Sequence, residues 1–181
     1  MRLTRAALRT LGLATGVVGL ACGLSAHAQP GGEPFRSKEG QFSVRFPGKP
    51  KENTQSAKGP GGDLTVYTAT FATTEGHVYL VSYTDFPPGT VKPEDHARMF
   101  DGVRDGLKKD GKLISEKDLT VGPEKLPGRE ILIEKEKPKQ LVRFRVIIRD
   151  HRFFQVAVVG SDEFVKGKEA TAFLDSFEVT K

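Results

Sequence analysis

The chain has 181 residues, with 28 basic side chains, 23 acidic side chains and a single cysteine, Cys22. Three of the basic residues lie in the first ten positions, and the 25 that remain are nearly balanced by the acidic ones and interspersed with them, which gives nucleic-acid binding no compositional support. A chain of this length can bury the core of one domain.

The first 28 residues predict a signal peptide. Three arginines precede an apolar run over 11–24, and the small residues Ala26 and Ala28 fit cleavage by a signal peptidase after Ala28. The run is shorter than the roughly 20 apolar residues that a membrane-spanning helix needs, so we expect no transmembrane segment in the mature chain. The protein is therefore predicted to be exported, either periplasmic or secreted.

Lipidation at Cys22 is the alternative, and it would tether the same domain to a membrane. Lipoprotein signals usually place a branched apolar residue three positions before the cysteine, where this chain has Gly19, so cleavage after Ala28 is favoured. That cleavage would remove the only cysteine. The mature protein would then contain no disulfide, thiol nucleophile or thiolate metal site.

The mature chain is expected to form one α+β domain over residues 35–181, after a flexible Pro/Gly-rich leader over 29–34. Alternating apolar residues over 42–46 predict a half-buried strand. The polar run that follows, up to Lys58, is consistent with an edge strand, and glycines and a proline over 59–62 predict a turn.

A hairpin and a helix are expected next. The β-branched and aromatic runs over 64–72 and 77–86 are joined by the turn residues 73–76, which predicts a β-hairpin. Residues 93–110 predict a helix, because Pro93 suits the first helical position and basic residues lie in the last turn. Its apolar face would consist of His96, Phe100, Val103 and Leu107.

The remainder of the chain predicts further strands and a second helix. We expect strands over 112–121, 128–136, 140–149 and 152–160, and a C-terminal helix from the apolar spacing of Ala170, Phe173, Leu174 and Phe177, with its start obscured by Gly167. The short connections predict a mainly antiparallel sheet packed by two helices. Consecutive apolar residues over 156–159 indicate that both faces of the sheet are covered.

A series of arginines marks the last third of the chain, at positions 143, 145, 149 and 152. If the preceding turn centres on Pro138 and Lys139, Glu134 lies opposite Arg143 and Leu132 lies opposite Arg145. The arginines would then meet opposite charges. We therefore favour a structural charge ladder over a site for an anionic ligand.

No residue set predicts a catalytic, cofactor-binding or metal site, and no cofactor is expected. The histidines His77, His96 and His151 lack a spacing that would bring two imidazoles onto one ion. Ser161 lacks the flanking glycines of a nucleophile elbow and is interpreted as a cap. The pair Asp101 and Asp105 is expected to be hydrated.

Aromatic residues lead into the loop 87–89, namely Tyr79, Tyr83 and Phe86, with Asp85 among them. Tyrosines at one end of a sheet can form a patch for a ligand or partner. The preferred interpretation is that these rings line the core, because strand aromatics usually pack.

Three segments resemble the PsbP-like domains, a group that includes the extrinsic photosystem subunit and many exported bacterial proteins. These segments are GQFSVRFPG over 40–48, VSYTDFP over 81–87 and FLDSF over 173–177. The resemblance implies an αβα sandwich around an antiparallel sheet, binding to another macromolecule, and no catalytic residues. The photosystem role is not transferred, because shared turns and core aromatics do not reproduce an interface.

Three functional hypotheses follow. The first is an exported, non-enzymatic binding or assembly domain whose partner is a protein or envelope component. The second is an extracytoplasmic hydrolase with a dispersed site formed from residues such as His77, Asp85 and Arg129. The third is a lipid-tethered form of the first.

Overall fold

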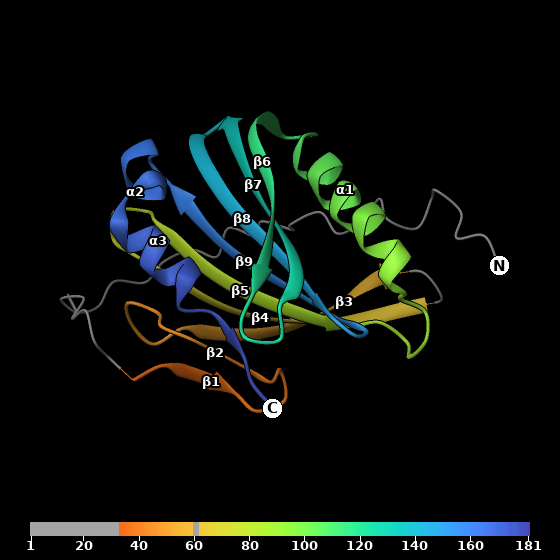
Figure 1. Ribbon diagram of the computed structural model, residues 1–181. Helices are drawn as coiled ribbons and strands as arrows, with labels where there is room; N and C mark the ends of the chain where they lie inside the picture. Colours follow the sequence, from red (N-terminus) through yellow and green to blue (C-terminus); the bar gives the residue numbers. More distant parts are fainter. Residues whose placement is uncertain (1–32, 60–61) are drawn as a thin grey trace.

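The computed structural model describes residues 33–59 and 62–181 (Figure 1). The predicted signal peptide, its cleavage site, Cys22 and most of the leader lie outside the described residues, as does the centre of the turn predicted over 59–62. Among the helices of the described part, none is long and apolar enough to cross a membrane.

A seven-stranded sheet forms the centre of the molecule, and every neighbouring pair in it is antiparallel. The predicted antiparallel α+β fold is confirmed. In spatial order the strands are β3 (Lys51–Gly59), β4 (Gly62–Ala72), β5 (Val78–Asp85), β9 (Arg152–Gly160), β8 (Lys139–Arg149), β7 (Leu126–Glu136) and β6 (Gly111–Val121).

Helices lie on both faces of this sheet, as the αβα sandwich requires (Figure 1). One face carries α1 (His96–Leu107), which is preceded by the single 3₁₀ turn η1 (Pro93–Asp95). The other face carries α2 (Asp162–Lys166) and α3 (Lys168–Asp175). The single predicted C-terminal helix is therefore two helices, because the extended backbone of Gly167 ends the first and begins the second.

A small sheet extends the layer that contains α3. It consists of β1 (Phe35–Ser37), β2 (Phe42–Val44) and β10 (Glu178–Val179), with β2 in the middle. The strand predicted over 42–46 is shorter than expected, since the Arg45 amide donates to Ser176 Oγ. All three residues of β2 are buried.

The main sheet has a hydrophobic core on each face, and alternate side chains of the central strand β9 contribute to both. Phe154, Val156 and Val158 point into the layer with α3 and the small sheet, whereas Phe153 and Ala157 point toward α1. Each large apolar side chain buried in this way stabilises the fold by roughly 1.5 to 3 kcal/mol. The prediction that both faces of the sheet are covered is confirmed.

The register predicted for the β7–β8 hairpin is wrong by two residues. Glu136 pairs with Lys139, so the two-residue turn is Lys137–Pro138 rather than Pro138–Lys139. As a result Glu130, not Leu132, lies opposite Arg145, and Leu132, not Glu134, lies opposite Arg143. A shift of two residues keeps each side chain on its face of the sheet, so the arginines still face a glutamate.

Candidate functional site

The hydrolase site proposed from sequence does not assemble. His77 directly precedes β5 and Asp85 ends it, so the strand rise of about 3.3 Å per residue separates them by roughly 26 Å. Arg129 lies on the face that packs against α1. These three residues cannot act on one substrate, because proton transfer requires hydrogen-bond distances.

The three histidines also lie in separate parts of the structure and do not converge on one site. His77 stacks on Phe164 with 4.0 Å between ring centroids, His96 contacts Phe100, and His151 lies in the turn before β9. Within the described ranges, no group of three or more histidine, cysteine, aspartate or glutamate residues is placed to hold a metal ion.

Ser161 and the aromatic residues that precede the loop 87–89 have roles in the fold. Ser161 caps α2, since its Oγ accepts from the Phe164 amide at 3.3 Å. Tyr79, Tyr83 and Phe86 are buried, which confirms that these rings line the core. Burial raises the pKa of Tyr79 to about 12, so its hydroxyl remains protonated at neutral pH.

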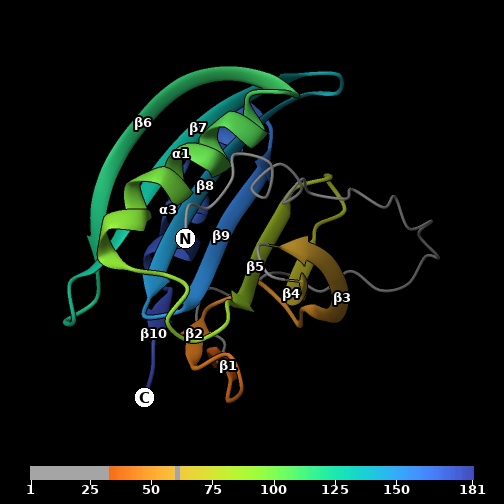
Figure 2. The ribbon, with the colours of Figure 1, turned by 90° about the vertical axis from the view of Figure 1, so that its right-hand side faces the viewer.

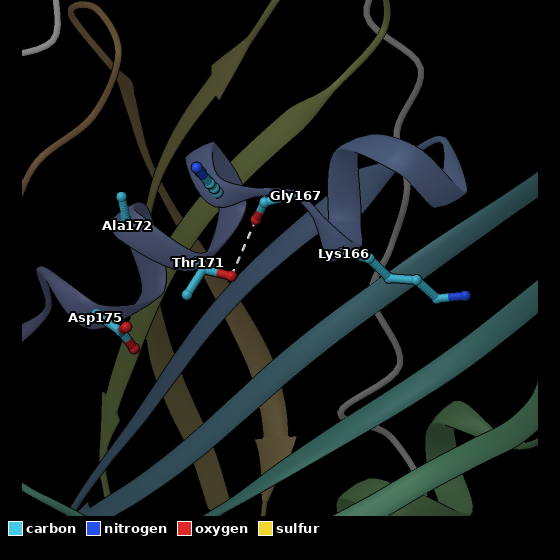
Figure 3. Close-up of a pocket in the computed structure, with 6 residues that line it drawn as sticks. Lys166, Gly167, Thr171, Ala172 and Asp175 are labelled. Carbon is cyan, nitrogen blue, oxygen red and sulfur yellow. Dashed lines mark hydrogen bonds between the residues drawn. The ribbon is translucent and has the colours of Figure 1, made fainter.

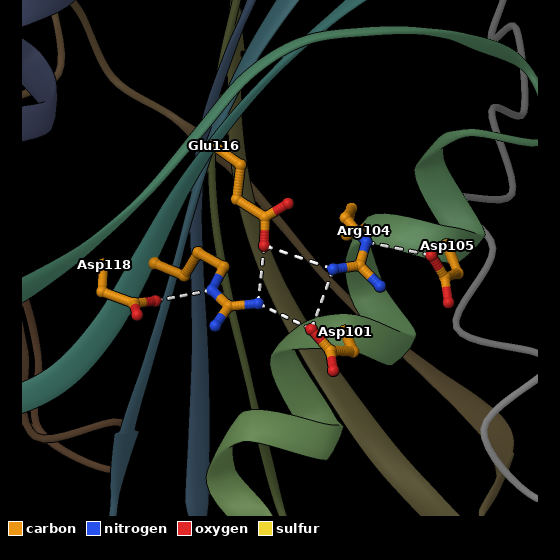
Figure 4. Close-up of polar contacts among 6 residues, drawn as sticks. Asp101, Arg104, Asp105, Glu116 and Asp118 are labelled. Atoms are coloured by element: carbon orange, nitrogen blue, oxygen red, sulfur yellow. Dashed lines mark hydrogen bonds and ion pairs between the residues drawn. The ribbon is translucent and has the colours of Figure 1, made fainter.

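An ionic network joins α1 to the edge of the sheet (Figure 4). Arg129 on β7 contacts Asp101 on α1 at 2.8 Å, and Glu116 and Asp118 on β6 at 2.6 Å each. A hydrogen bond from Arg104 lowers the pKa of Asp105. We call this group the Arg129 network, and its members are Asp101, Arg104, Asp105, Glu116, Asp118 and Arg129.

The Arg129 network was missed at the sequence level. Asp101 and Asp105 are 46% and 61% exposed, in keeping with the expected hydration, but both also form ion pairs with Arg104. Alternation of Glu116 and Asp118 along a strand was the available signal, but their partner could be found only once α1 and β7 were placed.

A second ionic network lies on the opposite face of the same strands. Glu130 is only 9% exposed and contacts Lys117 at 3.2 Å, Arg143 at 3.2 Å and Arg145 at 2.7 Å. Arg145 also contacts Asp175 on α3 at 2.8 Å. Burial raises the pKa of Glu130, but hydrogen bonds from Arg145 and Arg143 outweigh it and hold that pKa below its ordinary value. These five residues form the Glu130 network. It is the charge ladder that the sequence predicted, except that Glu130 and not Glu134 contacts the arginines.

Two shallow hollows lie beside α2 and α3. The first, about 300 Å³, is lined by residues that include Lys166, Lys168 and Asp175 (Figure 3). The second, about 340 Å³, lies around His77 and Phe164. Both are open to solvent, whereas small-molecule sites usually enclose most of their ligand. Neither hollow supports a specific ligand.

The β3 edge of the main sheet is a different kind of surface. None of the nine residues of β3 is buried, and its register with β4 is unbroken. Its outer edge has no neighbouring strand within the residues that the structure describes. Charges lie near its ends, at Lys51, Glu52 and Lys58, and the middle is uncharged. Such an edge presents backbone donors and acceptors that another strand can pair with.

An exposed aromatic residue lies beside this edge. Tyr67 on β4 is paired with Thr54 on β3, and it is 39% exposed. Its ring stacks on Tyr83 at 4.7 Å, and the Arg152 guanidinium lies 4.9 Å from the Tyr83 ring centroid. Arg152 is held in turn by two hydrogen bonds to Asp85. The exposed Tyr67 ring therefore rests on a stacked ring and an ion pair that connect it to β5 and β9.

Together, the antiparallel sheet between helical layers and the small sheet under α3 define a PsbP-like fold. Among solved structures, cyanobacterial PsbP (CyanoP) from Synechocystis sp. PCC 6803 aligns with a TM-score of 0.52 and 13% sequence identity, over 88% of this chain and 97% of that chain. At this identity the likeness shows the fold alone.

A second solved structure is more distant. Protein PA94 of unknown function from Pseudomonas aeruginosa aligns with a TM-score of 0.37 and 14% identity, over 77% of this chain and 89% of that chain. No protein-family model matches the chain, and the search of curated proteins found no match.

Proposed function

We propose that this protein is an exported, non-enzymatic assembly domain that binds a partner protein or envelope component through the β3 edge. The observation that carries the proposal is the nine-residue outermost strand β3, none of whose side chains is buried. Fixing the backbone of each residue costs about 1 to 2 kcal/mol, and apolar burial offsets this cost in most strands. β3 is therefore held by its pairing with β4 rather than by the core, and its outer edge, within the described residues, remains available to a partner.

The chemistry of the edge favours recognition by strand addition. An added strand receives main-chain hydrogen bonds along its whole length, and side chains at alternate positions supply specificity. The uncharged residues 53–57 place no charge opposite the middle of such a strand. Glu52 and Lys58 near the two ends would favour opposite charges in the partner.

Export is supported by the first 28 residues, with their three arginines, apolar run and Ala26–Ala28 site. The mass of the mature N-terminus tests this part of the proposal. Gln29, or its cyclised form, at the N-terminus would show cleavage after Ala28. An acylated Cys22 would instead show the lipid-tethered form, with the same domain held at a membrane.

Site-specific photo-crosslinking in exporting cells tests the binding role. A photoreactive residue at Gln55, in the middle of β3, is expected to form adducts with a defined partner. The matched control is Ser115, an exposed position on the opposite edge strand β6. Adducts from Gln55 but not from Ser115 support the proposal. Equal yields from both positions, or no adduct from Gln55, contradict it.

A further inference from the structure

We propose that the partner strand at this edge is β3 of a second copy of the chain, paired antiparallel about a two-fold axis at Gln55. This inference rests on the proposed binding role of the β3 edge. In a two-fold dimer the same strand meets itself, so its sequence must be complementary to its own reverse.

The charges of β3 have this complementarity. When Gln55 lies opposite Gln55 of the second copy, Glu52 lies opposite Lys58, and the pair occurs twice. The remaining opposed pairs contain no like charges, with Thr54 opposite Ser56, Asn53 opposite Ala57 and Lys51 opposite Gly59. Opposite charges directly across an antiparallel pair stabilise it.

The register that forms the charge pairs also aligns the entire strand, Lys51–Gly59, with itself. Because a two-fold antiparallel pair keeps opposed side chains on the same face, its neighbouring registers differ by two positions. These registers place Lys51 opposite Ala57 and Glu52 opposite Ser56, or Thr54 opposite Lys58, so neither forms a charge pair. The sequence therefore favours one register over its neighbours.

Within the described residues, β3 is the outermost strand of its sheet, which is the position that pairing with a second copy requires. Figure 2 shows α1 over the half of the sheet that contains β6, β7 and β8, with β3 at the opposite margin. Lys58 already contacts Asp63 on β4, but their side chains are 82% and 60% exposed, so the ammonium can face a second carboxylate. The two sheets would join into one continuous sheet.

Sedimentation velocity over a wide concentration range tests the inference. The wild-type chain is expected to show a reversible dimer. Glu52→Lys and Lys58→Glu, each alone, place like charges opposite each other and should weaken dimerisation by about tenfold or more. The double variant Glu52→Lys/Lys58→Glu restores opposite charges and should recover most of the wild-type affinity.

Two controls separate the interface from general effects of charge. Lys112→Glu, on the other edge strand, should leave the dimer unchanged. Thermal unfolding of each variant shows whether the exchange at Lys58 acts through loss of its contact with Asp63 instead. A monomer at all concentrations, or a dimer that Glu52→Lys does not weaken, would overturn the inference.

Disulfide trapping gives an independent measurement. In a chain carrying Cys22→Ser, which removes the native cysteine, Gln55→Cys is expected to form a cross-linked dimer on mild oxidation. Side chains directly opposite across an antiparallel pair have Cβ atoms about 4.5 to 5.5 Å apart, close to the separation that a disulfide needs. Thr54→Cys lies opposite Ser56 rather than itself and should cross-link about tenfold more slowly or less. Equal trapping at both positions contradicts the two-fold axis at Gln55.

These experiments separate this inference from the broader proposal. If the chain is monomeric but the photoreactive residue at Gln55 captures a different protein, the β3 edge binds a partner and the second-copy inference fails. If Gln55 captures neither a second copy nor another protein, both fail.

Discussion

The two edge strands of the main sheet, β3 and β6, differ in how far their side chains take part in the fold. On β6, Glu116 and Asp118 join the Arg129 network on one face, and Lys117 joins the Glu130 network on the other. On β3, the one ion pair found among the described residues joins Lys58 to Asp63 at the exposed end of the hairpin. In the part of the chain that the structure describes, the side chains of β3 therefore contribute less to the fold than those of β6, and the proposed binding surface lies on that edge.

The two strands also differ in how they resist unwanted pairing. Between Leu113 and Ser115 the register of β6 with β7 shifts, and the intervening Ile114 is 46% exposed. Bulges and charges in the middle of an edge strand disfavour pairing with another chain. β3 has charges only near its ends and an unbroken register. Within the described residues, β6 therefore carries features that disfavour pairing with another chain, and β3 lacks them in its middle.

The largest expected effect comes from removing the centre of the Glu130 network. Glu130→Ala leaves Arg143 and Arg145, both mostly buried, without their shared carboxylate. We expect a loss of about 3 kcal/mol in the free energy of unfolding, measured by urea denaturation with circular dichroism. Glu136→Ala, at the exposed end of β7, is the control and should change stability by less than about 0.5 kcal/mol. Similar losses in both variants would contradict a structural role for this network.

A smaller loss is expected from Arg129→Ala. The change leaves three carboxylates of α1 and β6 without Arg129, but they are partly exposed to water, so we expect about 2 kcal/mol. Hydrogen–deuterium exchange should accelerate in β6 and α1 and remain unchanged in β3. Faster exchange spread equally over both edges would refute the distinction drawn between them.

The pH dependence of stability should sharpen the same comparison. The folded-state pKa of Glu130 lies below its ordinary value near 4.5, so its contribution is complete above that value and is lost as the pH falls through the lower folded pKa. The wild-type chain should therefore lose more stability than Glu130→Gln between about pH 5.5 and pH 3. Parallel stability curves for the two proteins would show that the carboxylate does not act as a charged group.

Most of the fold was accessible from the sequence because alternation and turns determine which residues share a face. The β7–β8 register shows the limit. Moving the turn by one residue exchanged Glu134 for Glu130 as the partner of the arginines, yet their charge pairing survived because both glutamates lie on the same face. Gly167 shows another limit of prediction from the sequence. The glycine was compatible with an irregular start of one helix or with two helices, and the structure has two.

The β3 edge and the Arg129 network could be predicted from the sequence only in part. The polar run up to Lys58 was consistent with an edge strand, but its importance depends on the sheet order, which places β3 outermost. The Arg129 network depends on α1 packing over β6 and β7, which no local pattern specifies. Sequence patterns describe faces, whereas edges and helix docking follow from the assembled sheet.

The smallest effect on stability is expected at β3. Thr54→Lys introduces a charge in the middle of the exposed strand and should change the free energy of unfolding by only about 0.5 kcal/mol. The same change should abolish adducts from a photoreactive residue at Gln55, because a central charge disfavours strand addition. Glu116→Lys on β6 is the reverse case, since it breaks contacts to Arg104 and Arg129 and should lower stability while leaving the adducts intact. If Thr54→Lys unfolds the protein, or leaves the adducts unchanged, β3 is part of the structural framework and the two edges do not divide folding from binding.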